Sequence, residues 1–143
     1  MSFDQFDERV RTIMTQKPAW FEGTESPASD DDIARVEAAL GRTLPDQFKH
    51  FARVFGAGYF GASNISSLVE TSDWYVLSRP SVSVNGKPML VVSDDETGGY
   101  YGFVFDGTAY SPDIIYANPD DGNYTENTAS SFFEYIENSA LTL

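Results

Sequence analysis

The stretch from residue 29 to residue 61 constrains the fold most strongly, because it encodes two helices joined by a short turn. Ser29 can accept a hydrogen bond from a free backbone N–H of the first turn, and Asp32 can reach back to complete a capping box. Apolar residues follow at i, i+3 and i+7: Ile33, Val36 and Leu40. This spacing predicts an amphipathic helix. Gly41 can end that helix in the left-handed conformation.

The second half of this stretch predicts another helix directly after the first. Pro45 suits a first helical position, where a backbone N–H would have no partner. An aromatic stripe follows, and Gly56 stops the helix. Two helices with apolar faces and a connection of about four residues must pack as a corner on another layer. We therefore expect one core, shared with a sheet, to contain Leu40, Leu44, Phe48, Phe51 and Phe55.

The same residues resemble the signature of the SMI1/KNR4 (SUKH) superfamily. The matching run is Ile33-x-x-Val36-Glu37-x-x-Leu40-Gly41-x-x-Leu44-Pro45-x-x-Phe48-x-x-Phe51, closed by Gly56-Ala57-Gly58. This pattern is fairly specific because it fixes two helix ends and a turn together. The family often has Asn-Gly where this chain has Gly56-Ala57, but both pairs can supply a positive φ angle. The resemblance implies a leading helix, this helical corner, a meander of strands and a closing helix.

The rest of the chain fits that order, and we expect a single α+β domain over residues 1–143. Helices are predicted at residues 2–14 and near the C-terminus, the latter capped by Asn127 or Thr128. Strands are predicted at residues 64–69, 81–87, 89–92, 100–105 and 114–117, with a hairpin turn at Asn85-Gly86. Residues 71–77 fit either a helix or a strand. The N-terminal helices and the C-terminal helix should pack around a mainly antiparallel sheet.

The composition predicts a soluble cytoplasmic protein. A chain of 143 residues with 41% hydrophobic and 15% aromatic residues can build one hydrophobic core. There is no cysteine, which excludes disulfides and thiolate metal sites. The first residues, MSFDQFDERV, show neither the basic start nor the apolar segment of a secretory signal. No apolar run approaches the length of a membrane span, so no membrane association is expected.

Charge is distributed unevenly along the chain. Residues 1–87 contain 12 acidic and 9 basic side chains, whereas residues 88–143 contain 10 acidic side chains and neither lysine nor arginine. A region with acidic residues and no lysine or arginine repels nucleic-acid phosphates and anionic lipids and attracts basic partners. Acidic surfaces also keep proteins soluble, so charge alone does not establish a cationic partner. No nucleic-acid partner is expected.

The apparent cofactor and zinc motifs lack the context that their chemistry requires. The run Gly56-Ala57-Gly58-Tyr59-Phe60-Gly61 matches the dinucleotide fingerprint G-x-G-x-x-G. It follows a predicted helix rather than a strand, which indicates a helix stop and a turn instead of a nucleotide site. His50 is the only histidine, and one imidazole without cysteine cannot build a typical zinc site. His50 should lie at the edge of the buried face of its helix.

Two clusters of acidic residues could suggest a calcium site or a pair of catalytic carboxylates. Neither Asp94-Asp95-Glu96 nor Asp120-Asp121 follows the alternating ligand spacing of an EF-hand loop. Acid–base catalysis by such a pair would require burial that raises one pKa. We therefore expect no catalytic residue, no cofactor and no metal ion. A hydrolase that uses paired carboxylates is the remaining enzymatic alternative.

The resemblance implies a function in protein binding. Bacterial members of the superfamily are largely immunity proteins of polymorphic and contact-dependent toxin systems, which bind and neutralise a cognate toxin domain, often a nuclease. Nucleases present basic clefts to phosphates, so an acidic face that bears tyrosines fits such a partner. The alternative is a regulatory protein-interaction scaffold, similar to the fungal cell-wall regulators of the same superfamily.

We expect the partner to bind two acidic loops, at residues 94–99 and 118–127. The predicted contact residues are five acids and a tyrosine: Asp94, Asp95, Glu96, Asp120, Asp121 and Tyr124. Tyrosine supplies contact area and a hydroxyl at low entropic cost. At least half of the tyrosines in this part of the chain are expected only to cover the sheet. Neither loop is an expected core element, so all five carboxylates should be exposed to solvent.

Overall fold

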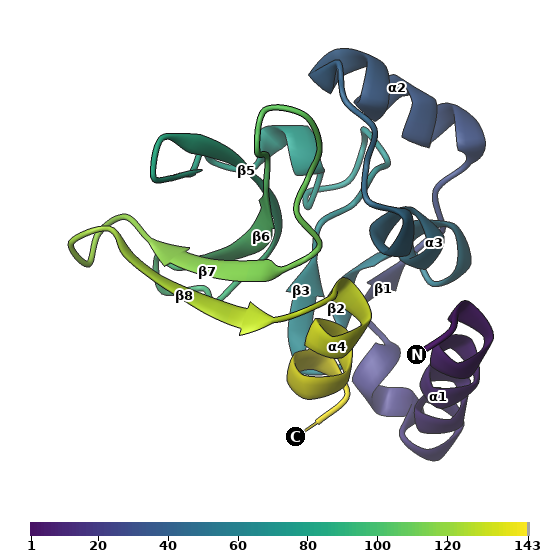
Figure 1. Cartoon of the computed structure of the whole chain (residues 1–143). Helices are drawn as coiled ribbons and strands as arrows, with labels where there is room; N and C mark the ends of the chain where they lie inside the picture. The colour runs from purple at the N-terminus through teal and green to yellow at the C-terminus, as the bar shows by residue number, and fades with distance from the viewer. Residues whose placement is uncertain (143) are drawn as a thin grey trace.

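Two antiparallel sheets and the helices around them form the fold (Figure 1). The computed structural model describes residues 1–142. The helical segments are α1 (Phe3–Gln16), η1 (Pro18–Phe21), α2 (Asp30–Leu40), α3 (Asp46–Val54), η2 (Val76–Ser78), α4 (Phe132–Tyr135) and the π-helical η3 (Ile136–Ala140). The strands are β1 (Thr24–Glu25), β2 (Ala57–Phe60), β3 (Ser63–Ile65), β4 (Ser83–Val84), β5 (Lys87–Asp94), β6 (Tyr100–Val104), β7 (Ile114–Asn118) and β8 (Tyr124–Ala129). The predicted α+β class is confirmed.

Capping residues determine where the first helices begin and end. The backbone N–H of Gln5 donates to the Ser2 hydroxyl at 3.1 Å, and the N–H of Ser2 donates to the Gln5 side chain at 2.9 Å. Ser29 and Asp32 form the same capping box at the start of α2. The helix ends at Gly41, whose φ of 67° is left-handed. The predicted boundaries of the first two helices are thus confirmed to within a turn.

The aromatic stripe of α3 lies at the centre of the main hydrophobic core. Four of the predicted core residues are at most 7% exposed: Leu44, Phe48, Phe51 and Phe55. The Phe51 ring lies 4.8 Å from that of Phe60 and 5.5 Å from that of Phe132, so it links α3 to β2 and α4. Leu40 is partly buried and packs against the same core. The prediction of a shared core is confirmed.

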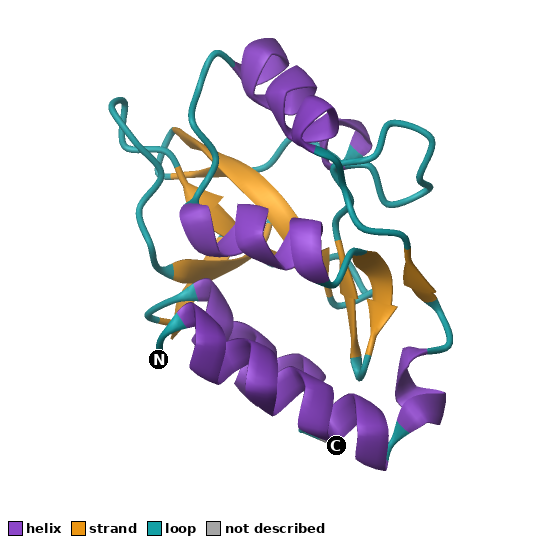
Figure 2. Cartoon of the chain, turned by 90° about the vertical axis from the view of Figure 1, so that its right-hand side faces the viewer, coloured by secondary structure: helices purple, strands orange, loops and turns teal. Residues whose placement is uncertain are grey.

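The strands form two sheets, in the orders β1-β2-β3 and β4-β5-β6-β7-β8, and neighbouring strands in each are antiparallel. The sheets meet where the backbone N–H of Ser66, just after β3, donates to the carbonyl of Val92 on β5 at 2.8 Å. Helices α1, α2 and α3 gather on one side (Figure 2), and the β7–β8 hairpin projects away from them (Figure 1). Within residues 1–142, no helix has the length and apolar character needed to cross a bilayer.

Residues 57–60 form a strand rather than the predicted turn. This strand, β2, pairs with β1 on one side and β3 on the other. Gly56 and Gly58 have φ angles of 96° and 81°. A Cβ at Gly56 would lie 2.0 Å from the carbonyl oxygen of Glu25, so only glycine allows β1 to approach this closely. Backbone packing explains these glycines, and the predicted helix stop at Gly56 is confirmed.

The C-terminal part differs from the prediction in two ways. Residues 124–129 form β8 instead of the end of an acidic loop. The last helix is capped by Ser131, whose hydroxyl accepts a hydrogen bond from the N–H of Glu134, rather than by Asn127 or Thr128. β8 is an edge strand whose first five residues are exposed, so it lacks the apolar alternation from which strands are predicted. Of residues 71–77, which fitted a helix or a strand, residues 71–74 form turns and bends, Tyr75 forms an isolated bridge with Ser67, and the last two residues belong to η2.

Candidate functional site

Two acidic loops lie side by side at one end of the five-stranded sheet. The β5–β6 loop comprises residues 95–99, and the β7–β8 loop comprises residues 119–123. They share this end because β6 and β7 are adjacent antiparallel strands, with Tyr100 opposite Ala117. The approach is close, since a Cβ at Gly98 would lie 3.3 Å from Oδ2 of Asp120. The fold therefore brings together two segments that are about twenty residues apart in sequence.

Asp94 is not the solvent-exposed acid predicted from the sequence. Its carboxylate forms an ion pair with Arg79, and the two side chains are 17% and 8% exposed. Arg79 also donates to the Ser66 hydroxyl at 2.8 Å and to the side-chain oxygen of Asn64 at 3.0 Å. A buried carboxylate is strongly unfavourable unless it is paired and hydrogen-bonded. The charge of Asp94 is thus compensated within the fold.

Asp95 organises the β5–β6 loop and is half-buried rather than freely exposed. Its Oδ1 accepts hydrogen bonds from the backbone N–H groups of Thr97 and Gly99 at 2.9 and 2.8 Å. Its Oδ2 accepts one from the Tyr116 hydroxyl at 2.7 Å. Burial raises the pKa of Asp95, but these hydrogen bonds outweigh burial and lower the pKa below its usual value. Asp95 is therefore ionised at neutral pH.

The other three predicted acids, Glu96, Asp120 and Asp121, are exposed. Glu96 accepts a hydrogen bond at Oε1 from the Tyr59 hydroxyl at 2.9 Å, and this bond raises the pKa of Tyr59. Asp120 and Asp121 lie in the turn that joins β7 to β8. Within residues 1–142, none of these three carboxylates forms a salt bridge. Their charges are available to a partner.

A row of tyrosine rings runs from the core to the exposed edge of the sheet. We call Tyr135, Tyr101, Tyr116 and Tyr124 the tyrosine row. Successive ring centroids along it are 5.1, 4.9 and 6.3 Å apart. Tyr135 is 2% exposed, whereas Tyr124 on β8 is 48% exposed. The Tyr124 hydroxyl donates to Glu126 at 3.1 Å, which raises the pKa of Tyr124. The outer end of the row thus adds aromatic surface beside the acidic loops.

Two residues of this surface, Tyr59 and Glu126, were not predicted as contacts. Tyr59 reaches Glu96 from β2, across a separation of 37 residues, and no local signal connects them. Glu126 lies opposite Tyr116 in the β7–β8 register. The i, i+2 spacing of Tyr124 and Glu126 could have indicated one face of a strand. The row of exposed polar residues around them obscured that signal.

The chemistry of these groups suits recognition of a cation better than proton transfer. A pair of catalytic carboxylates requires one acid with a raised pKa, whereas the pKa of Asp95 is lowered. Among residues 1–142, no three acidic or histidine side chains are placed to hold one metal ion. His50 lies elsewhere, paired with Asp7 at 2.8 Å where α3 meets α1, and it is partly buried as predicted.

Comparison with known protein families gives a match to most of the chain. The model of the family SUKH_6, described as SMI1-KNR4 cell-wall, matches residues 30–136 of the chain. The match starts at the first residue of α2, spans the five-stranded sheet and ends in the C-terminal helical segment. It therefore includes the helical corner, both acidic loops and the whole tyrosine row. No curated protein sequence matches the chain.

Proposed function

The chain belongs to the SMI1/KNR4 (SUKH) family, and we propose that it is a non-catalytic immunity protein that binds and neutralises a cognate toxin domain. The observation that carries this proposal is the close approach of the two acidic loops, at residues 95–99 and 119–123. Residues 88–143 contain 10 acidic side chains and no lysine or arginine, and the exposed acids Glu96, Asp120 and Asp121 form no salt bridge within residues 1–142. Such a surface favours a basic protein partner and disfavours nucleic acid.

A nuclease domain is the toxin that this surface fits best. Nucleases hold phosphates in basic clefts, and the exposed carboxylates of Glu96, Asp120 and Asp121 can occupy or shield such a cleft. Complementary charges speed the encounter and orient the partners, whereas aromatic side chains supply contact area that becomes buried. Tyr124, which is 48% exposed, can supply such contact area. We place the protein in the cytoplasm, where it would protect the cell that makes it.

We assign no catalytic role to the acidic loops. A hydrolase with paired carboxylates needs one protonated carboxylic acid at neutral pH. The hydrogen bonds to Asp95 favour its ionised form, and Asp94 is held in an ion pair with Arg79. The Asp95 carboxylate is therefore held as an anion, and the Asp94 carboxylate is occupied by its ion pair. The ionised form of Asp95 and the ion pair of Asp94 therefore support binding without turnover.

A regulatory protein-interaction scaffold is the second candidate. The observation that favours it is the description of the matched family, which refers to the cell wall. The acidic surface supports this function equally well, because a scaffold also recognises other proteins. The two candidates differ in the partner, since only an immunity protein requires a toxin.

The toxin-like C-terminal domain of a protein encoded in the adjacent reading frame provides the test. We expect the purified chain to form a stable complex with that domain and to abolish its activity at equimolar concentration. The chain alone should not turn over nucleic acid. A neighbouring frame without a toxin-like domain, or a domain that stays active in excess folded chain, would contradict the immunity function and leave the scaffold.

A further inference from the structure

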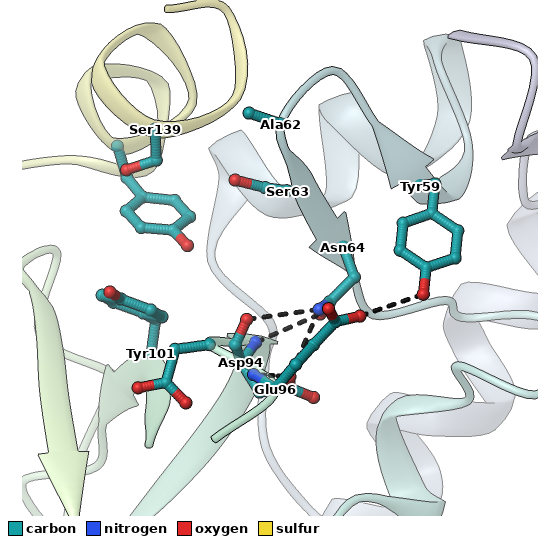
Figure 3. A pocket seen from close by; sticks show the side chains of 10 residues that line it. Tyr59, Ala62, Ser63, Asn64, Asp94, Glu96, Tyr101 and Ser139 are labelled. Carbon is teal, nitrogen blue, oxygen red and sulfur yellow. Dashed lines mark hydrogen bonds between the residues drawn. The ribbon is translucent and has the colours of Figure 1, made fainter. Parts of the chain in front are cut away.

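A polar pocket lies beside the acidic loops, between β3, the β5–β6 loop and the C-terminal helical segment (Figure 3). Tyr101 and Ser139 lie on one side of it, and Tyr59 lies on the other (Figure 3). Its volume is about 240 Å³. Pockets that enclose whole small-molecule ligands are larger, at about 300–1,000 Å³. This pocket is therefore suited to one side chain rather than to a cofactor.

The outer part of the pocket is negatively charged. Both Asp95 and Glu96 line it. Glu96 uses Oε1 to accept the hydrogen bond from Tyr59, which leaves Oε2 available to a ligand. The third acid in the lining, Asp94, is compensated by Arg79. In the part of the chain that the structure describes, no lysine or arginine lines the pocket.

Hydroxyl groups form the inner part of the pocket. Tyr135 lines it although only 2% of this residue is exposed. Burial raises the pKa of Tyr135 to about 12, and the neighbouring Ser93 hydroxyl acts to lower it. Ser63 and Ser139 also line the pocket, whereas Ser93 does not. Their hydroxyl oxygens can accept hydrogen bonds, so the inner part of the pocket offers acceptors to a ligand with N–H donors.

We propose that this pocket receives the guanidinium group of an arginine side chain from the partner protein. The inference rests on the proposed function, which supplies the source of the arginine. A guanidinium has five N–H donors and no acceptor, and it therefore matches a lining of carboxylate and hydroxyl oxygens. Its flat cationic face can also lie against the rings of Tyr59 and Tyr101.

The hydroxyls at the inner end offer acceptors for the N–H donors of the ligand. An N–H of the ligand can donate to the hydroxyl oxygen of Tyr135, Ser63 or Ser139. A phosphate or carboxylate ligand would instead face Asp95 and Glu96 with no cation in the lining. The pocket is thus selective for a cation with several donors.

The test uses the full folded chain and two small probes, N-acetyl-arginine amide and its neutral isostere N-acetyl-citrulline amide. NMR titration should show saturable shifts at Tyr59, Tyr101 and Ser139 with the arginine probe. The citrulline probe should bind about tenfold more weakly, because hydrogen bonds between charged groups are the stronger ones. Equal binding of both probes, or shifts confined to other parts of the chain, would overturn the proposal.

A matched pair of variants tests whether the arginine probe binds in the pocket or is attracted by charge elsewhere on the chain. Glu96→Gln keeps an acceptor for Tyr59 but removes the charge, and it should weaken binding of the arginine probe about tenfold. Asp73→Asn removes an exposed charge that neither lines the pocket nor lies on the acidic loops, and it should change binding by less than about twofold. Equal weakening by both variants would mean that diffuse charge, not the pocket, attracts the probe.

Failure of the arginine pocket and failure of the immunity function can be told apart. A chain that binds the arginine probe but neutralises no toxin would contradict the immunity function and not the pocket. A chain that neutralises a toxin but does not respond to the arginine probe would contradict the pocket and not the immunity function.

Discussion

Three successive acids at the end of β5 behave differently because their surroundings differ. Asp94 pairs with Arg79 inside the fold, Asp95 accepts hydrogen bonds that hold its loop, and Glu96 is exposed. The sequence predicts that acids cluster here, but it does not show which of them are free. The groups that decide this, Arg79 and Tyr116, lie on other parts of the chain. Only the fold brings them to the loop.

The lowered pKa of Asp95 predicts a pH-dependent contribution to stability. The folded state favours the ionised form, so the contribution is present above the pKa of an unfolded aspartate, about 3.9. It is lost as the pH falls through the lower pKa of the folded state. Asp95→Asn should therefore reduce the free energy of unfolding at pH 7, and the difference from wild type should shrink at pH 3.

Urea denaturation at the two pH values measures this difference. Asp121→Asn serves as the control, because a substitution on the exposed loop should change stability by no more than about 0.5 kcal/mol at either pH. A deficit for Asp95→Asn that is the same at pH 3 and pH 7 would show that the ionised carboxylate is not the stabilising group.

At the scale of elements, Arg79 ties the two sheets together. It follows η2, and its guanidinium reaches Asn64 on β3 and Asp94 at the end of β5. The same guanidinium lies 5.1 Å from the ring centroid of Trp74, within the range of a cation–π contact. The network fixes the position of the β5–β6 loop relative to β3, and hence the shape of the polar pocket.

Arg79→Ala should destabilise the protein by about 2–3 kcal/mol, because it leaves the largely buried carboxylate of Asp94 without its cation. Arg53→Ala makes the same substitution in an exposed pair with Asp30, where the side chains are 48% and 85% exposed. That control should change stability by about 0–1 kcal/mol. Urea denaturation of both variants gives the comparison. Losses of equal size would show that the Arg79 pair contributes no more than a surface ion pair.

Elements with strong local signals were predicted, and those that depend on distant partners were not. The helical corner was predicted because its caps, its stop at Gly41 and its apolar spacing lie within one short stretch. β2 was mistaken for a turn because its glycines serve the close approach of β1. β8 was mistaken for a loop because an exposed edge strand carries no apolar pattern. For the same reason Tyr124 was placed on a loop instead of a strand.

At the scale of the whole molecule, the acidic loops and the N-terminal helices lie in different parts of the fold. Helices α1, α2 and α3 gather on one side, and the β7–β8 hairpin projects away from them (Figures 1 and 2). Exposed substitutions usually change stability by about 0.5 kcal/mol or less. Charge on the proposed partner surface can therefore be removed while the core of the protein remains folded.

The choice of charges to remove follows from the structure. Asp94 and Asp95 are kept, because their carboxylates stabilise the fold through Arg79 and the loop backbone. The loop variant carries four changes at exposed acids: Glu96→Gln, Asp120→Asn, Asp121→Asn and Glu126→Gln. The control variant has the same net charge and changes four exposed acids of the N-terminal helices: Asp4→Asn, Glu8→Gln, Asp31→Asn and Asp46→Asn.

The most direct test of a charge-guided binding surface is the rate of association with the cognate toxin domain, measured over a range of salt concentrations. We predict that the loop variant associates about tenfold more slowly than wild type at low ionic strength, with a flatter dependence on salt. The rates should converge as salt shortens the screening length to about 8 Å at physiological ionic strength. The control variant should associate nearly as fast as wild type. An unchanged rate and salt slope in the loop variant, or equal slowing in the control, would contradict the proposed binding surface.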